Sequence, residues 1–99
     1  MNLQALMKQA QSMQKNLMDS KNKIEKMEFE GTSELVTIKM NGKREVLSVK
    51  IDKNATLDND DIEILEDMIA IAINDALKKI EKEINDKIGS QTGAFGNLI

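Results

Sequence analysis

Apolar residues follow a heptad pattern over the first quarter of the chain. Eight positions, spaced alternately three and four residues apart, form one stripe with a single polar member: Leu3, Leu6, Ala10, Met13, Leu17, Ser20, Ile24 and Met27. This spacing is typical of a long helix that packs along a narrow, coiled-coil-like seam, and it predicts a helix over residues 2–28. Such a helix would be roughly 40 Å long at 1.5 Å per residue, more than the rest of the chain can cover. We therefore expect part of it to project or to pack against a second copy.

The middle of the chain alternates between apolar and polar residues in the manner of β-strands. Residues 35–40 and 46–51 each alternate in this way, and Asn41-Gly42 follows the first of them. An Asn-Gly pair between two alternating segments favours a hairpin with a type I′ turn, since both central residues of that turn have a positive φ. Residues 29–33 are a weaker candidate for a preceding strand. We predict three antiparallel strands with one face covered by a helix.

The last predicted element is a helix over residues 58–88. Its middle is apolar nearly all round, so two of its sides must be buried. The sheet would cover one side and a second copy the other, which places Met68, Ile71 and Leu77 at or near a two-fold dimer interface. Residues 89–99 contain three glycines and are predicted to be a flexible tail after a single domain over residues 1–88.

Composition argues against most enzyme chemistry. The chain contains no Cys and no His, and therefore lacks a thiolate nucleophile, the commonest general base and the usual zinc ligands. Asp58, Asp60 and Asp61 could suggest calcium, but an EF-hand loop starting at Asp58 would need Glu where the chain has Ile69. We interpret these aspartates as helix caps, and predict no enzyme activity, no metal, no cofactor and no small-molecule substrate.

Hydropathy favours a cytoplasmic protein without a membrane partner. The longest apolar run covers residues 68–73, far short of the roughly 20 residues that span a bilayer. The first residues also lack the charged stretch and continuous apolar core of a secretory signal.

The chain has a net charge of −3, but its charged residues are distributed unevenly along the sequence. Residues 1–27 carry five lysines and two acidic residues, a net +3, whereas residues 58–99 carry four lysines and ten acidic residues, a net −6. Opposite the heptad stripe lies a row of amide and ammonium groups: Lys8, Gln11, Lys15, Asn22 and Lys26. Such donors suit phosphate oxygens, although an ordinary solvated helix face has the same composition.

A second basic group lies at the end of the predicted second helix. It consists of Lys78, Lys79 and Lys82, which either extend a basic surface or only complement the helix dipole. The acidic residues at the start of the same helix also suit that dipole. Arg44, in the predicted hairpin, is interpreted as a solvated cation whose guanidinium could still reach a phosphate.

Several segments, in order along the chain, match the pattern of a known family. They are residues 6–11 (Leu-Met-Lys-Gln-Ala-Gln), Met13-Gln14, Asn41-Gly42, residues 65–69 (Leu-Glu-Asp-Met-Ile) and residues 74–76 (Asn-Asp-Ala). Over residues 6–88 the sequence resembles the YbaB/EbfC family of bacterial nucleoid-associated proteins. The resemblance implies an α–β–β–β–α subunit that dimerises through its sheet and second helix. It also implies that the first helices project as arms that bind DNA.

These observations together predict an α+β fold, with a long amino-terminal helix, a three-stranded antiparallel sheet and a long carboxy-terminal helix in a two-fold dimer. The resemblance implies a protein that binds duplex DNA in the nucleoid and contributes to nucleoid organisation or gene regulation. Phosphate contacts should dominate, since the chain has one Arg and no aromatic base-stacking platform. The candidate DNA-binding residues are Lys8, Gln11, Lys15, Asn22, Lys26, Lys78, Lys79 and Lys82. The alternative, which the net acidity favours, is a dimeric protein-interaction module that uses the heptad helix and does not bind DNA.

Overall fold

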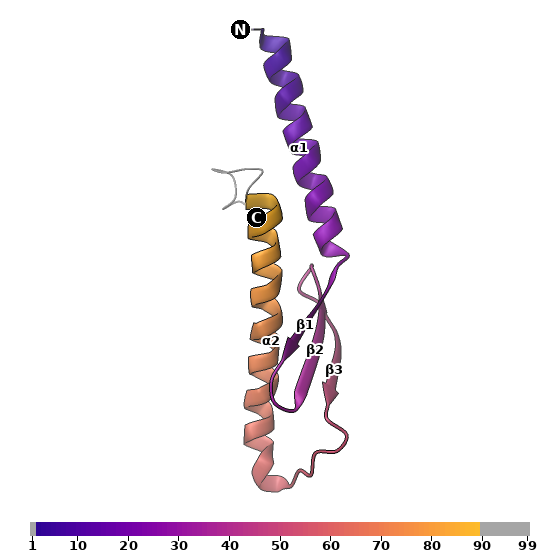
Figure 1. Ribbon diagram of the computed structural model, residues 1–99, viewed down its shortest axis with the longest axis vertical. Coiled ribbons are helices and arrows are strands. Elements are labelled where there is room, and N and C mark those ends of the chain that lie inside the picture. Colours follow the sequence, from indigo (N-terminus) through magenta and orange to yellow (C-terminus); the bar gives the residue numbers. More distant parts are fainter. Residues whose placement is uncertain (1, 90–99) are drawn as a thin grey trace.

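The computed structural model describes residues 2–89, which form two long helices and a three-stranded sheet (Figure 1). A 3₁₀ turn precedes the second helix and a π-helical turn, Asn85–Gly89, follows it. The predicted α+β fold is confirmed, while the predicted tail, apart from Gly89, lies outside the described residues. The elements along the chain are α1 (Leu3–Glu25), β1 (Glu28–Thr32), β2 (Val36–Asn41), β3 (Val46–Ile51) and α2 (Ile62–Ile84).

The three strands form one antiparallel sheet in the order β1-β2-β3, and α2 packs on one face of it. Ile38 of β2 pairs with Val49 of β3, and Val36 pairs with Ile51. Side chains opposite one another in an antiparallel pair point to the same face, so Val49 and Ile51 lie on the side of the sheet that α2 occupies. Because α2 packs on β1 and β2, the side chains of β3 remain largely exposed.

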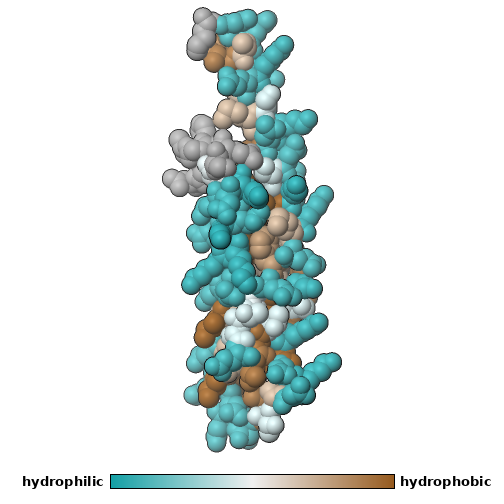
Figure 2. Space-filling view, viewed as in Figure 1, coloured by the Kyte–Doolittle hydropathy of each residue, from teal (hydrophilic) through white to brown (hydrophobic). Residues whose placement is uncertain are grey.

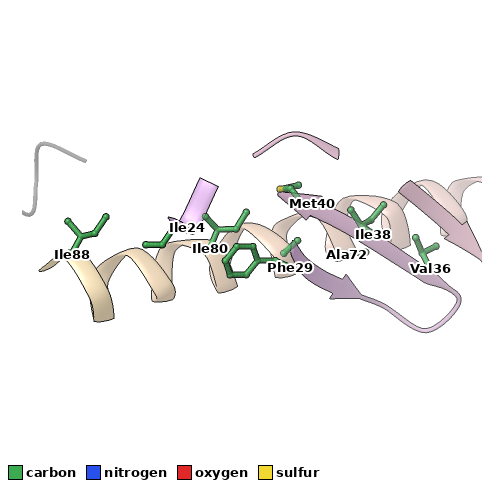
Figure 3. Close-up of a cluster of buried hydrophobic side chains, with 9 residues drawn as sticks. Ile24, Phe29, Val36, Ile38, Met40, Ala72, Ile80 and Ile88 are labelled. Carbon is green, nitrogen blue, oxygen red and sulfur yellow. The ribbon is translucent and has the colours of Figure 1, made fainter. Parts of the chain in front are cut away.

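The core lies between α2 and the sheet and continues to the base of α1 (Figure 3). Strand β2 contributes every second residue to it, and α2 contributes every fourth, as the periods of strand and helix require. It is small and almost entirely aliphatic. Its buried members are Ile24, Phe29, Val36, Ile38, Met40, Ala72, Ala76, Ile80 and Ile88.

The turn between β1 and β2 is fastened to α2 by backbone and side-chain contacts. Gly31 lies so close to α2 that a Cβ on it would stand 2.8 Å from the Cβ of Ala76. Next to it, the Thr32 N–H donates to the Asp75 carboxylate at 2.9 Å, and the Ser33 hydroxyl donates to the Met68 carbonyl at 2.7 Å. These contacts determine where α2 crosses the sheet.

The hairpin between β2 and β3 is confirmed, whereas the predicted type I′ turn is wrong. Neither Asn41 nor Gly42 has a positive φ; that conformation belongs to Arg44, with φ of 67°. The Arg44 N–H donates to the Asn41 carbonyl at 3.0 Å, and the Asn41 N–H donates to the Glu45 carbonyl at 3.0 Å. The connection is therefore a three-residue loop in which a turn is followed by one residue in the left-handed region.

Gly42 is required for the close approach of α1 to the hairpin, and not for a type I′ turn. Its N–H donates to the Met27 carbonyl at 3.1 Å, and a Cβ at this position would overlap the carbonyl group of Ile24. The glycine is needed because the end of α1 presses against the hairpin, and no larger residue fits there.

Helix α1 extends beyond the rest of the subunit (Figure 1). Leu17 and Ile24 pack on the core, but every residue from 2 to 16 is exposed, and the molecule measures 70 × 20 × 14 Å. We call residues 3–16 the arm. The helix ends at Glu25, before the predicted residue 28, because the chain turns there: the Met27 N–H donates to the Ile24 carbonyl at 3.0 Å and β1 begins at once.

Asp58 caps the segment that leads into α2, which confirms the interpretation of this aspartate as a cap. Its side chain accepts the N–H of Asp60 at 2.9 Å, and the Asp61 carboxylate accepts the N–H of Asp58 at 3.0 Å. The Asp58 side chain also accepts the N–H of Asp61, and this reciprocal pair of Asp58 and Asp61 is a capping box. It closes the 3₁₀ turn Asn59–Asp61, so α2 itself begins at Ile62 and ends at Ile84, inside the predicted range of 58–88.

Candidate nucleic-acid interface

Four candidate DNA-binding residues lie along one exposed side of α1, and a fifth, Lys26, is the residue that caps its carboxyl end. We call them the outer row: Lys8, Gln11, Lys15, Asn22 and Lys26. Lys8 and Lys15 are two turns apart, so their side chains point within about 20° of each other. Leu17 and Ile24, which pack on the core, point to the opposite side of the helix. The outer row therefore faces away from the subunit's own core and is open to a ligand as large as a duplex.

The candidate lysines of α2 lie elsewhere and differ among themselves. Lys78 and Lys82 are exposed. The Lys79 ammonium donates to the Glu30 carbonyl of β1 at 2.6 Å and lies 3.4 Å from the Asp75 carboxylate. Lys79 thus has a role in joining α2 to the edge of the sheet. These lysines lie beside β1, whereas Lys8 and Lys15 belong to the arm, so the structure does not bring the two groups together within one subunit.

Asp75 joins α2 to the end of β1, a role that little in the sequence indicated. Asp75 pairs within its own subunit, with the Thr32 N–H and the Lys79 ammonium. The backbone N–H of Thr32 lowers the pKa of the Asp75 carboxyl from its usual 3.8, and the ammonium groups of Lys79 and Lys78 lower it further, against some desolvation. The one signal in the sequence was the four-residue spacing from Asp75 to Lys79, which is common for ion pairs on a helix.

Three cations that are not among the candidate residues surround a hollow at the base of α1. The hollow has a volume of about 430 Å³ and lies where α1, the hairpin loop and the end of α2 meet. Lys21 of α1 and Lys43 and Arg44 of the loop line it. In the sequence, the only sign of this cluster is that Lys43 and Arg44 are adjacent. The position of Lys21 beside them depends on how α1 packs against the loop.

An apolar surface remains uncovered on β3. Val46, Leu47, Val49 and Ile51 are all exposed, with Val49 at 49% of its full accessible area. Figure 2 shows hydrophobic residues gathering over the half of the molecule that holds the sheet and the start of α2, while the opposite half is mostly hydrophilic. Exposed apolar side chains that gather on one element are typical of interaction surfaces.

The three residues expected at a dimer interface do not share one surface of α2. Ile71 is 57% exposed, while Met68 and Leu77 are partly buried against the core. Asp75 contacts β1, so its side of α2 faces that edge of the sheet. Ile71 points within about 40° of Asp75, and Leu77 points about 160° away from Asp75, toward β3. Leu77 and Ile71 therefore lie on different sides of α2.

Other kinds of site find little support in the part of the chain that the structure describes. Over residues 2–89, no three His, Cys, Asp or Glu side chains are grouped so as to hold a metal ion. Within the same residues no helix has the length and apolar character needed to cross a bilayer. The features that remain are cationic surfaces on α1 and the hairpin, and an apolar surface on β3.

Comparisons with known proteins agree with this arrangement. A family model described as the YbaB/EbfC DNA-binding family matches residues 1–95. A protein of Legionella pneumophila (strain Corby) named "Nucleoid-associated protein" is 46% identical over 96 residues, which cover 95% of this chain and 84% of that protein. One of the same name from Lachnoclostridium phytofermentans is 45% identical over 99 residues, which cover 98% of this chain and 82% of the other.

The fold is also found in a solved structure. The crystal structure of an uncharacterized protein from Helicobacter pylori aligns with a TM-score of 0.67 and 22% identity, over 100% of this chain and 99% of that one. At this level of identity the likeness shows the fold alone. On the family model and the relatives above, the chain belongs to the YbaB/EbfC DNA-binding family.

Proposed function

We propose that this protein is a nucleoid-associated protein that binds duplex DNA as a homodimer, mainly through phosphate contacts from α1, and contributes to nucleoid organisation or gene regulation. The observation that carries the proposal is the outer row, exposed on a helix that projects from the domain, in a chain of a DNA-binding family. The names of its relatives place those proteins on the nucleoid, which supports the same location, in the cytoplasm, for this one.

The chemistry of the arm suits binding that does not depend on DNA sequence. Lys8 and Lys15 present ammonium groups and Gln11 presents an amide between them, all exposed. Ammonium groups bind phosphate oxygens and release counterions from the duplex, without reading the bases. Since the chain carries a net charge of −3, most of its surface should repel DNA, so contact is confined to locally basic faces.

The apolar surface of β3 supports the homodimer. A second copy that covered Val49 and Ile51 would remove these side chains from water on both subunits. Two-fold symmetry would then place two arms on one particle. Two weak sets of phosphate contacts joined in this way bind far more tightly than one.

A salt titration of duplex binding tests the function. Fluorescence anisotropy of a labelled duplex, measured between about 50 and 200 mM salt, should give a steep fall of log K with log[salt]. The double variant Lys8→Ala/Lys15→Ala should flatten that slope by about two units for each subunit in contact. Because both side chains are exposed, the variant should remain folded by circular dichroism.

The matched control is Lys50→Ala/Lys53→Ala, which removes the same charge from the far side of the sheet and the loop after it. This control should keep the parental slope. An unchanged affinity and slope in the Lys8/Lys15 variant would show that the outer row is not the interface, and no duplex binding at low salt would overturn the function itself.

A second candidate function is a protein-interaction module. The observation in its favour is the exposed heptad seam of the arm, where Leu3 is 71% exposed and Leu6 and Met13 also face solvent. A partner helix could pack along this seam. In that case Leu6→Gln/Met13→Gln would abolish partner binding, and the parent protein would show no salt-dependent affinity for duplex DNA.

A further inference from the structure

The hollow at the base of α1 has a rim of cations and an aliphatic floor. Lys21 approaches from α1, and Lys43 and Arg44 approach from the hairpin loop. The floor is formed by Ile24 of α1, Ile84 at the end of α2 and Ile88 of the π-helical turn that follows. Ile24 and Ile88 are buried members of the core.

The loop that carries two of these cations is held in place by its own hydrogen bonds. The Asn41 side-chain oxygen accepts the N–H of Lys43 at 2.9 Å and the N–H of Glu45 at 3.1 Å. Gly42 is fastened to the chain that leaves α1 by its bond to the Met27 carbonyl. The cationic side chains are therefore presented from a fixed backbone, which lowers the entropic cost of binding a ligand.

Arg44 occupies a backbone conformation that arginine rarely adopts. Its φ of 67° lies in the left-handed region, where glycine or asparagine is usual at this position of a three-residue loop. A side chain kept at a strained position points to a use for that side chain.

The charge in the hollow exceeds what the neighbouring helix ends require. Three cations face one carboxylate, that of Glu25. In the described part of the chain, the ion pairs join Lys39 to Glu28 and Lys79 to Asp75, and neither involves the rim. The carboxyl ends of α1 and α2 each carry the equivalent of about half a negative charge, and one cation would offset the two together. A surplus of positive charge remains for an anion.

We propose that this hollow binds a phosphate group of the DNA backbone, as a contact separate from the outer row. The Arg44 guanidinium and the two ammonium groups would hold the phosphate oxygens. The proposal rests on the proposed DNA-binding function and adds a site to it. Lys21 points about 120° around α1 from Lys15, so the hollow engages a different stretch of backbone from the one at the outer row.

The test is the double variant Lys43→Ala/Arg44→Gly, compared with Lys53→Ala and with the parent protein. Glycine suits the left-handed conformation at position 44, so the variant should melt at or above the temperature of one with Lys43→Ala alone. Duplex affinity, measured by anisotropy at about 100 mM salt, should fall at least ~5-fold, and the salt slope should flatten by about two units for each contacting subunit. Lys53→Ala should match the parent, and adding Lys8→Ala/Lys15→Ala should flatten the slope further.

The outcomes distinguish a failure of this proposal from a failure of the proposed function, and one further titration tests the ligand. If the parent binds duplex DNA and the Lys43/Arg44 variant binds it with the same affinity and slope, the proposal is overturned while the proposed function stands. If the parent binds no duplex, both fail. Titration with pyrophosphate, followed by NMR shifts at Arg44, distinguishes a site for free phosphates: shifts with pyrophosphate but unchanged duplex affinity in the variant would contradict a backbone contact.

Discussion

Gly31 of β1 and Ala72 of α2 touch backbone to backbone, so closely that a Cβ on Gly31 would overlap the carbonyl oxygen of Ala72. The contact exists because Gly31 has no side chain and because α2 presents alanines, Ala72 and Ala76, on the turns that cross β1. A helix with larger residues at these positions would stand further from the sheet. The neighbouring bonds from Thr32 to Asp75 and from Ser33 to Met68 depend on this separation.

The substitution Gly31→Ala should therefore lower the free energy of unfolding by about 1–3 kcal/mol or more, since the obstructing atoms belong to a backbone that cannot move aside. Urea denaturation measures the change. Gly89→Ala is the matched control, because a Cβ at Gly89 has no neighbour within 4 Å, and its effect should stay within about 0.5 kcal/mol. Equal effects of the two substitutions would contradict the close contact.

The ionised Asp75 should make stability depend on pH in the acid range. Its pKa is lowered in the folded state, chiefly by the Thr32 N–H, so the stabilisation is complete above the usual value of 3.8 and is lost as the pH falls through the folded-state pKa. Asp75→Asn should therefore lower Tm at neutral pH, with a difference from the parent that shrinks in acid. Thermal melts across this range, with the exposed Asp67→Asn as control, check the expectation; a difference independent of pH would refute it.

The apolar surface of β3 predicts a variant that separates subunits without unfolding them. Val49 is half exposed within the subunit, so Val49→Asp should leave the secondary structure intact by circular dichroism. A carboxylate there would lose its water on association, a cost of several kcal/mol that should shift the dimer to monomer in sedimentation. Lys50→Asp provides the control, because adjacent strand residues point to opposite faces. A monomeric parent at micromolar concentration would defeat the dimer proposal.

Residues at the base of α1 should contribute far more to the stability of the fold than residues of the arm. Ile24 is buried against the core, and Ile24→Ala should cost about 2–5 kcal/mol of unfolding free energy. Leu6, which belongs to the same heptad stripe, is exposed on the arm, and Leu6→Ala should change stability by less than about 0.5 kcal/mol in dilute protein. If both substitutions destabilised the protein equally, the arm would have to be packed against a partner under those conditions.

Local patterns along the chain were sufficient to predict each main element. The heptad stripe predicted α1, alternation predicted β2 and β3, and acidic residues predicted the capped start before α2. These features depend on neighbours in sequence, through helix and strand periods and through short-range caps, and so they are visible without a fold. The family was visible for the same reason, because its motifs are short segments in a given order.

Contacts between distant segments were decided only when the chain folded. By local rules, Asn41-Gly42 predicts a type I′ turn. The backbone of α1 presses on Gly42, however, and the residue with a positive φ is Arg44. Asp75 accepts an N–H from Thr32, a residue 43 positions away, and Lys21 meets Lys43 and Arg44 at one hollow because α1 ends against the hairpin. Periodicity shows which face of an element is apolar, but the elements that cover that face depend on backbone approach distances, which glycine and alanine set in this protein.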